Sequence, residues 1–137
     1  MGIVHANIEL RNNGDVELSR RKYIGEDDIR QITISMMVDS GALMLAINEE
    51  IRQALGLEII DHRISQLANG MRLEVPVAGS IEVRYEGRFC TTNALVLPDD
   101  TEPLLGAIPM EEMDLWINPS RNLLTAVHPE GPIMSLK

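Results

Sequence analysis

Apolar and polar residues alternate along most of this chain, and that period of two constrains its fold more than any other feature. A strand places successive side chains on opposite faces, so alternation is typical of strands with one buried face. The clearest examples are residues 4–10 and 32–38. We also predict strands at residues 16–18, 57–60, 63–67, 72–77, 81–85 and 88–97.

Turn and helix signals separate these strands. Asn and Gly tolerate positive φ, so we expect hairpin turns at residues 12–14 and at Asn69-Gly70. One short helix is expected between Asn48, which can cap it, and Gly56, which can end it. A second is expected to begin near Pro109. Short strands, hairpin connections and two short helices predict an all-β fold, either a small barrel or a sandwich.

The length of 137 residues fits one domain, because domains most often contain about 100–150 residues. We predict a single domain over residues 1–137, with a core at about 3–127 and a loose C-terminal tail at 128–137. The hydrophobic share of 45% can bury a core and argues against disorder. Neither a long apolar run nor a signal-peptide pattern is present, so we expect a cytoplasmic protein without membrane contact.

Charge and residue types exclude several classes of function. The chain has 12 Lys and Arg against 21 Asp and Glu, a net charge of −9 that disfavours binding to nucleic acid or anionic lipid. Its only cysteine, Cys90, excludes an internal disulfide and a Cys-rich zinc site. The three histidines are scattered and no glycine-rich phosphate loop occurs, so we expect no metal and no cofactor.

Asp39-Ser40-Gly41 is the one motif that points to chemistry. The triplet alone is a common turn, and one interpretation leaves Asp39 in an ordinary turn of a monomeric barrel. The residues around the triplet favour a functional interpretation, because the triplet follows the apolar strand at 32–38 and precedes Ala42. Far downstream, Leu104-Leu105-Gly106 follows another apolar strand and precedes the second expected helix.

This ordered pair of motifs resembles the retropepsin-like aspartic proteases, specifically the small single-domain members found outside viruses. The matching stretches lie in the expected order between about residues 3 and 127, at residues 36–42, 67–70, 103–106 and 115–119. The resemblance implies an all-β acid-protease barrel with one or two short helices, active as a homodimer.

The resemblance also implies a role for each matching residue. Asp39 would be the catalytic residue. Ser40 would hydrogen-bond across the dimer, Gly41 would present its N–H to the Asp39 carboxylate, and Ala42 would complete the loop. A flap over a peptide or protein substrate would contain Leu67, Ala68, Asn69 and Gly70, and the motif beneath the active site would contain Leu104, Leu105 and Gly106.

These roles predict an aspartic endopeptidase in which an Asp39/Asp39′ dyad activates water across a two-fold axis. Two carboxylates about 3 Å apart share one proton, so one acts as base and the other as acid. Leu43 departs from the family pattern, which usually has Ser, Thr or Asp at this position. The alternative interpretation is therefore a catalytically silent dimeric module of the same fold that binds a peptide or protein.

Overall fold

The structure is a computed structural model that describes residues 2–66 and 68–133. Its strands are β1 (Val4–Asn12), β2 (Gln31–Val38), β3 (Leu45–Asn48), β4 (Glu58–Gln66), β5 (Arg72–Tyr85), β6 (Arg88–Leu97), β7 (Leu104–Leu105), β8 (Leu115–Asn118) and β9 (Leu123–Ala126). Its helices are α1 (Asn13–Arg20), α2 (Glu49–Leu55) and α3 (Ala107–Glu112), with a 3-10 turn η1 (Glu26–Asp28). The predicted all-β class is confirmed.

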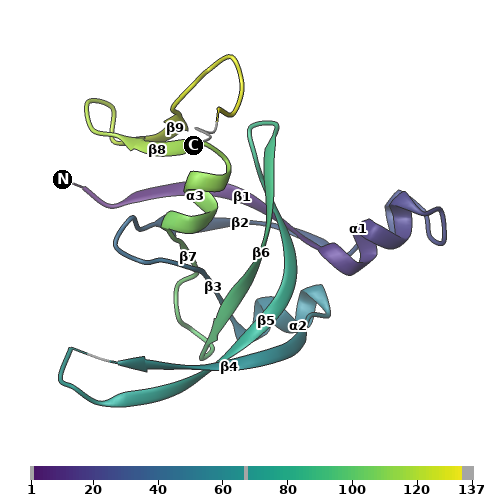
Figure 1. Cartoon of the computed structure of the whole chain (residues 1–137), viewed down its shortest axis with the longest axis horizontal. Coiled ribbons are helices and arrows are strands. Elements are labelled where there is room, and N and C mark those ends of the chain that lie inside the picture. The colour runs from purple at the N-terminus through teal and green to yellow at the C-terminus, as the bar shows by residue number, and fades with distance from the viewer. Residues whose placement is uncertain (1, 67, 134–137) are drawn as a thin grey trace, which may run out of the picture.

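The larger sheet closes on itself and leaves one hairpin outside. Its strand order is β1-β2-β7-β3-β6-β5-β4, and β1 also pairs with β5. A ring of strands therefore forms a barrel, and β4 is attached to it only through β5. Residues 72–76 of β5 pair with β4 but not with β6, so the β4–β5 hairpin extends beyond the barrel. In Figure 1 this hairpin projects on one side and helix α1 on the other, with the small β8–β9 sheet beyond α3.

The interior of the barrel is aliphatic, as the alternation requires. In β1, Ile8 and Leu10 are fully buried, while Asn7, which directly precedes Ile8, is exposed to solvent. Helices α2 and α3 contribute Leu55 and Met110 to the same core. Among the described residues no helix has the length and apolar character needed to cross a membrane.

Two predicted strand breaks are wrong. Residues 58–60 and 63–66 of the two predicted segments belong to the single strand β4 (Glu58–Gln66), which carries an irregularity between Ile59 and Asp61. The segments at 72–77 and 81–85 belong to β5, whose register with β6 shifts between Ala78 and Ile81. A bulge keeps a strand continuous but shifts the alternation of buried and exposed side chains by one residue. In the sequence, this shift in alternation looks like the end of one strand and the start of another.

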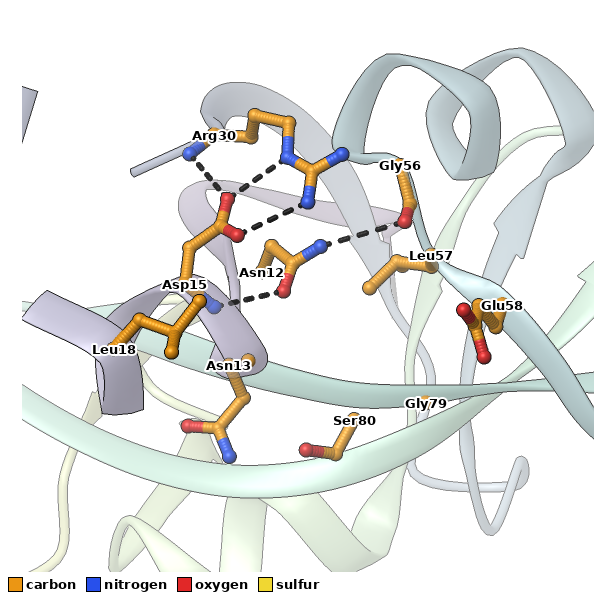
Figure 2. A pocket seen from close by; sticks show the side chains of 11 residues that line it. Asn12, Asn13, Asp15, Leu18, Arg30, Gly56, Leu57, Glu58, Gly79 and Ser80 are labelled. Atoms are coloured by element: carbon orange, nitrogen blue, oxygen red, sulfur yellow. Dashed lines mark hydrogen bonds and ion pairs between the residues drawn. The ribbon is translucent and has the colours of Figure 1, made fainter. Parts of the chain in front are cut away.

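The predicted hairpin at 12–14 and strand at 16–18 are also wrong, because helix α1 occupies this segment. Asn12 is its N-cap: the side-chain Oδ1 accepts the Asp15 N–H at 3.1 Å. Asp15 is buried and binds the Arg30 guanidinium through Nε at 2.8 Å and Nη2 at 3.0 Å. Figure 2 shows these contacts around a pocket of about 470 Å³ at the foot of α1. The bonds between Asp15 and Arg30 link α1 to the residue before β2.

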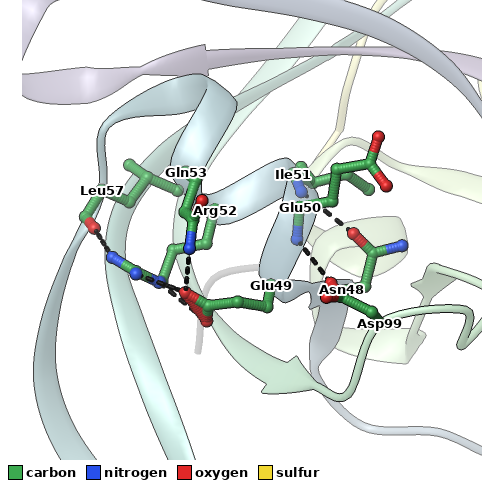
Figure 3. A network of polar contacts seen from close by, with 8 residues as sticks. All are labelled: Asn48, Glu49, Glu50, Ile51, Arg52, Gln53, Leu57 and Asp99. Carbon is green, nitrogen blue, oxygen red and sulfur yellow. Dashed lines mark hydrogen bonds and ion pairs between the residues drawn. The ribbon is translucent and has the colours of Figure 1, made fainter.

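Helix α2 begins and ends where the sequence predicts. Asn48 caps it by accepting the Ile51 N–H at 2.9 Å, and Gly56 ends it with a left-handed φ of 64°. The Asp99 carboxylate accepts the Glu50 N–H at 3.1 Å. Figure 3 shows how this network connects α2 with the loop after β6.

Candidate functional site

Asp39 lies at the point where β2 leaves the barrel and the loop of residues 39–44 begins. Its backbone N–H donates to the Leu105 carbonyl at 3.0 Å, and its carbonyl accepts the Ala42 N–H at 3.1 Å. Its side-chain Oδ1 accepts the Gly41 N–H at 2.9 Å. The loop backbone therefore orients a half-buried carboxylate toward the surface.

The motif at 104–106 braces this loop from the side. Strand β7 runs parallel to β2, with Leu104 paired to Met37 and Leu105 to Val38. A Cβ at Gly106 would lie 2.4 Å from the Met44 carbonyl oxygen, so only glycine fits without a shift of the backbone. The structure thus brings the two predicted motifs into direct contact.

The first turn of α3 adds a second brace that the sequence reasoning missed. The N–H groups of Ala107 and Ile108 donate to the carbonyls of Ala42 and Leu43 at 2.8 and 2.9 Å. The first N–H groups of a helix lack partners within the helix and need acceptors elsewhere. Pro109 indicated the start of this helix, so the need for acceptors could have been inferred, although not their identity.

The Asp39 carboxylate has few partners of its own. Within residues 2–66 and 68–133, Gly41 is its only hydrogen-bond donor and no ion pair includes it. No group of three or more His, Cys, Asp or Glu in that part of the chain could hold a metal ion. The site offers one carboxylate, which suits acid–base chemistry if a second acidic group joins it.

Beside Asp39, Ser40 opens onto a groove of about 400 Å³ between α3 and β8. Trp116, which is 46% exposed, lines this groove, and one carboxylate lies in it, that of Glu111. The full lining is Ser40, Ala107, Met110, Glu111, Leu115, Trp116, Ile117 and Pro119. Most of these side chains are apolar, so the surface next to the Asp39 loop suits contact with another protein surface.

The predicted flap is the tip of the β4–β5 hairpin. Asn69 closes the turn by accepting the Met71 N–H at 2.9 Å, and Gly70 has a positive φ of 85°. Ala68 belongs to the same turn, whereas Leu67 lies outside the described residues. In the described part of the chain no hydrogen bond joins this turn to loop 39–44. The structure therefore assembles Asp39–Ala42 with Leu104–Gly106 and leaves the hairpin tip apart from them.

Comparisons with known proteins agree with this geometry. Residues 26–108 match the family described as aspartyl protease, and both motifs lie inside that range. A retropepsin-like aspartic protease from Rickettsia conorii superposes with a TM-score of 0.55 at 23% identity, covering 88% of this chain and 78% of that one. The retroviral protease-like domain of Ddi1 from Leishmania major superposes with a TM-score of 0.54 at 15% identity, covering 92% and 90%. These likenesses show a retropepsin-like fold. A sequence search of characterised proteins gave no match.

Proposed function

This chain belongs to the aspartyl protease family, and from that premise we propose that it is an aspartic endopeptidase whose active site forms between two copies. Each copy supplies one Asp39. The observation that carries the proposal is the Asp39 loop itself, where a surface carboxylate is oriented by Gly41 and braced by β7 and α3. Within residues 2–66 and 68–133 no second carboxylate is bound to it.

The reaction follows from two carboxyl groups that share one proton. The ionised Asp39 removes a proton from water, and the hydroxide adds to the scissile carbonyl carbon. The protonated Asp39 of the second copy gives its proton to the carbonyl oxygen, which yields a tetrahedral diol. Collapse of the diol breaks the C–N bond: one diol hydroxyl gives its proton to the ionised Asp39, and the protonated Asp39 gives its proton to the leaving amine. The carboxyl pair then again holds one proton. The Gly41 N–H, bound to Oδ1, keeps the carboxylate oriented through these steps.

A two-fold axis is the simplest way to bring the second Asp39 into place, because it sets a residue opposite its own copy. The surface around Ser40 suits such a contact. Trp116 lies in the adjoining groove, and the apolar side chains of Ile3 and Leu123 are exposed on nearby chain segments. Burying them against a second copy would be favourable.

The hairpin would serve as a flap over an extended peptide. Ile64, Met71 and Leu73 expose large apolar side chains near its tip, where a bound peptide could cover them. Closure would exclude water from the carboxyl pair and order the substrate. Since the barrel does not pair with residues 72–76, the hairpin can move without breaking its ladder to β6.

Incubating the protein with a mixed peptide library between pH 4 and 8, with cleavage scored by mass spectrometry, tests the proposal. We expect Asp39→Asn to lower cleavage by at least about a hundredfold, because general acid–base catalysis is lost. Activity should also depend on pH in a bell shape, because one Asp39 must be ionised and the other protonated.

Asp27→Asn is the matched control, since Asp27 is an exposed carboxylate on η1 and precedes the first residue of β2, whereas Asp39 follows the last residue of that strand. It should cleave as the wild type does. Circular dichroism should show that both variants keep the fold. Cleavage by Asp39→Asn at the wild-type rate would refute the proposal.

Leu43 favours a second candidate function, a dimeric module that binds peptides without cleaving them. Its side chain is 70% exposed beside the catalytic motif, while its carbonyl is fixed by the Ile108 N–H. An apolar side chain at this place can contact a peptide but cannot take part in proton transfer. Binding of labelled peptides with no product at any pH would favour this candidate, and any Asp39-dependent product would exclude it.

A further inference from the structure

Three polar residues far apart in the sequence meet behind the groove, and the proposed reaction uses none of them. Arg88 is the first residue of β6, Asp114 separates α3 from β8, and His128 follows β9. They lie where the small β8–β9 sheet joins the barrel. Figure 1 shows this sheet as a layer separate from the strands of the barrel.

Arg88 fixes the ends of two elements to the barrel. Its side chain is only 9% exposed, and Nη1 donates to the carbonyls of Met113 and Asp114, both at 3.1 Å. Its Nη2 donates to the His128 carbonyl. The last carbonyls of a helix have no partners within the helix, so Arg88 both caps α3 and holds the segment that leaves β9.

Asp114 closes the open end of the β8–β9 sheet. Its carbonyl accepts the Val127 N–H at 2.9 Å, next to the Leu115–Ala126 pair where the two strands begin and end. Its carboxylate oxygen Oδ2 accepts from His128 Nδ1 at 2.6 Å and from the Ile133 N–H at 3.3 Å. Val127, and His128 and Ile133 from the tail predicted to be loose at 128–137, are thus bound to the turn before β8.

We propose that Arg88, Asp114 and His128 form a proton-dependent clasp that holds the β8–β9 sheet and residues 127–133 to the barrel. Histidine side chains change charge between about pH 5 and 8. A protonated His128 makes a charge-assisted hydrogen bond to Asp114, about twice as strong as the neutral one. The clasp is therefore tight when His128 carries its second proton and loosens when that proton leaves.

The surrounding charges set the pH window. Burial acts to raise the pKa of Asp114, but its hydrogen bonds to His128 and Ile133 and the cations beside it bring that pKa below the usual 3.8. A carboxyl group whose pKa is lowered in the folded state stabilises that state above its ordinary pKa. This stabilisation is lost as pH falls through the lowered pKa. Histidine side chains gain their second proton toward the acid end of the range from about pH 5 to 8, where the Asp114 carboxylate is still ionised because its pKa is lowered. Both charges of the clasp are therefore present together on the acid side of that range.

Other charged groups around the clasp leave this direction unchanged. Arg88 stays cationic throughout, and its guanidinium lies 3.7 Å from the Asp114 carboxylate. Glu86 and Tyr85 line a pocket with Arg88 and Pro129. Burial raises the pKa of Tyr85, so its hydroxyl stays neutral.

The chain carries its own reporter for a test, because Trp116 is its only tryptophan and lies on β8. Hydrogen exchange of β8 and β9 amides and iodide quenching of Trp116 would be measured at pH 5.5 and pH 8. After correction for intrinsic exchange rates, we expect roughly fivefold greater protection of the β8–β9 sheet at pH 5.5. The β1–β2 amides, remote from the clasp, should show no such change.

Two variants make the test specific. His128→Gln keeps a donor for Asp114 but cannot take up a proton, so the pH effect should vanish while the sheet remains formed. His62→Gln, at an exposed position on β4, should keep the wild-type effect. Equal protection at both pH values in the wild type, or a pH effect that survives in His128→Gln, would overturn the proposal. Neither readout requires enzymatic activity.

Discussion

At the scale of single residues, Gly106 is a position where one added atom would collide with backbone rather than with a side chain. Its φ of −89° is open to any residue, so space and not backbone conformation requires glycine. A Cβ would lie 2.4 Å from the Met44 oxygen and 2.8 Å from the carbonyl carbon and oxygen of Leu43. These are backbone atoms, and Leu43 is held in addition by the Ile108 N–H. Relieving the overlap would therefore require a shift of the backbone at Leu43 and Met44.

We therefore expect Gly106→Ala to destabilise the protein by about 1–3 kcal/mol, the usual cost of overpacking. Urea unfolding followed by circular dichroism measures the change. Gly25→Ala is the matched control, because the nearest atom to its Cβ is the Asp28 carboxylate at an ordinary 3.5 Å and its φ is negative. If the two variants unfold at the same urea concentration, crowding at Gly106 is not the reason for the glycine.

Individual residues also mark the limit of what the sequence could predict. Asp39-Ser40-Gly41 stood out because a turn motif directly follows a strongly alternating strand. Arg88, Asp114 and His128 gave no such signal, since each looks like an isolated surface charge in the sequence. Their contact requires the closed barrel, and only the three-dimensional structure brings them together.

At the scale of elements, helix α1 shows how local polar contacts override a short alternating pattern. Val16 and Leu18 suggested a strand, but two apolar residues are too few to distinguish a strand from one face of a helix. Asn12 decided the outcome, because its side chain caps α1 and also donates to the Leu55 carbonyl at 2.8 Å. That second bond spans 43 residues of sequence and could not be foreseen.

The ion pair between Asp15 and Arg30 attaches α1 to β2, and its loss should depend on pH. The Arg30 side chain is the main reason that the pKa of Asp15 lies below its usual value. A lowered carboxyl pKa stabilises the fold above about pH 4 and ceases to do so as pH falls through it. We expect Asp15→Asn to lower the free energy of unfolding by about 1–2 kcal/mol at pH 7. The difference from wild type should shrink below pH 3.5.

Urea titrations at pH 7 and pH 3 measure this dependence. Glu17→Gln supplies the control, because Glu17 forms only an exposed pair with Arg20 on the same helix and should matter by less than about 0.5 kcal/mol. A destabilisation by Asp15→Asn that is equal at both pH values would show that the charge of Asp15 is not what holds α1.

Strand β5 illustrates a different limit of sequence reasoning. Gly79-Ser80 looked like a break between two strands, yet β5 continues through it. A Cβ at Gly79 would lie 2.2 Å from the Asn93 side-chain oxygen on β6. The glycine therefore allows two strands to approach closely, a role that cannot be separated from a turn without the partner strand.

At the scale of the whole molecule, closure of the barrel creates the candidate site. Loop 39–42 and motif 104–106 are far apart in the sequence, and the parallel pairing of β2 with β7 unites them. Alternation alone predicted strands but not their order, because the period of two carries no information about partners. The family resemblance supplied the barrel fold and the expectation that motif 104–106 lies beneath loop 39–42, and the fold comparisons agree with that fold.

The number of copies that the site needs can be counted by mixing active and inactive chains. If one dyad requires Asp39 from both copies, a mixed dimer of wild type and Asp39→Asn is inactive. Adding an equal amount of variant to the wild type, with free exchange of subunits, should lower the wild-type activity to about half. A fourfold excess should lower it to about one fifth, because fewer wild-type chains then meet each other.

Two checks make this titration decisive. Sedimentation must show that Asp39→Asn dimerises as the wild type does, so that mixed dimers form in the expected proportion. Adding Asp27→Asn in place of Asp39→Asn should leave the activities additive, because both copies then keep Asp39. If the inactive variant does not reduce the wild-type activity at any ratio, each chain works alone. The second proton-transfer group would then have to come from the same copy, and Glu111, the carboxylate in the groove beside Ser40, would be the first residue to test.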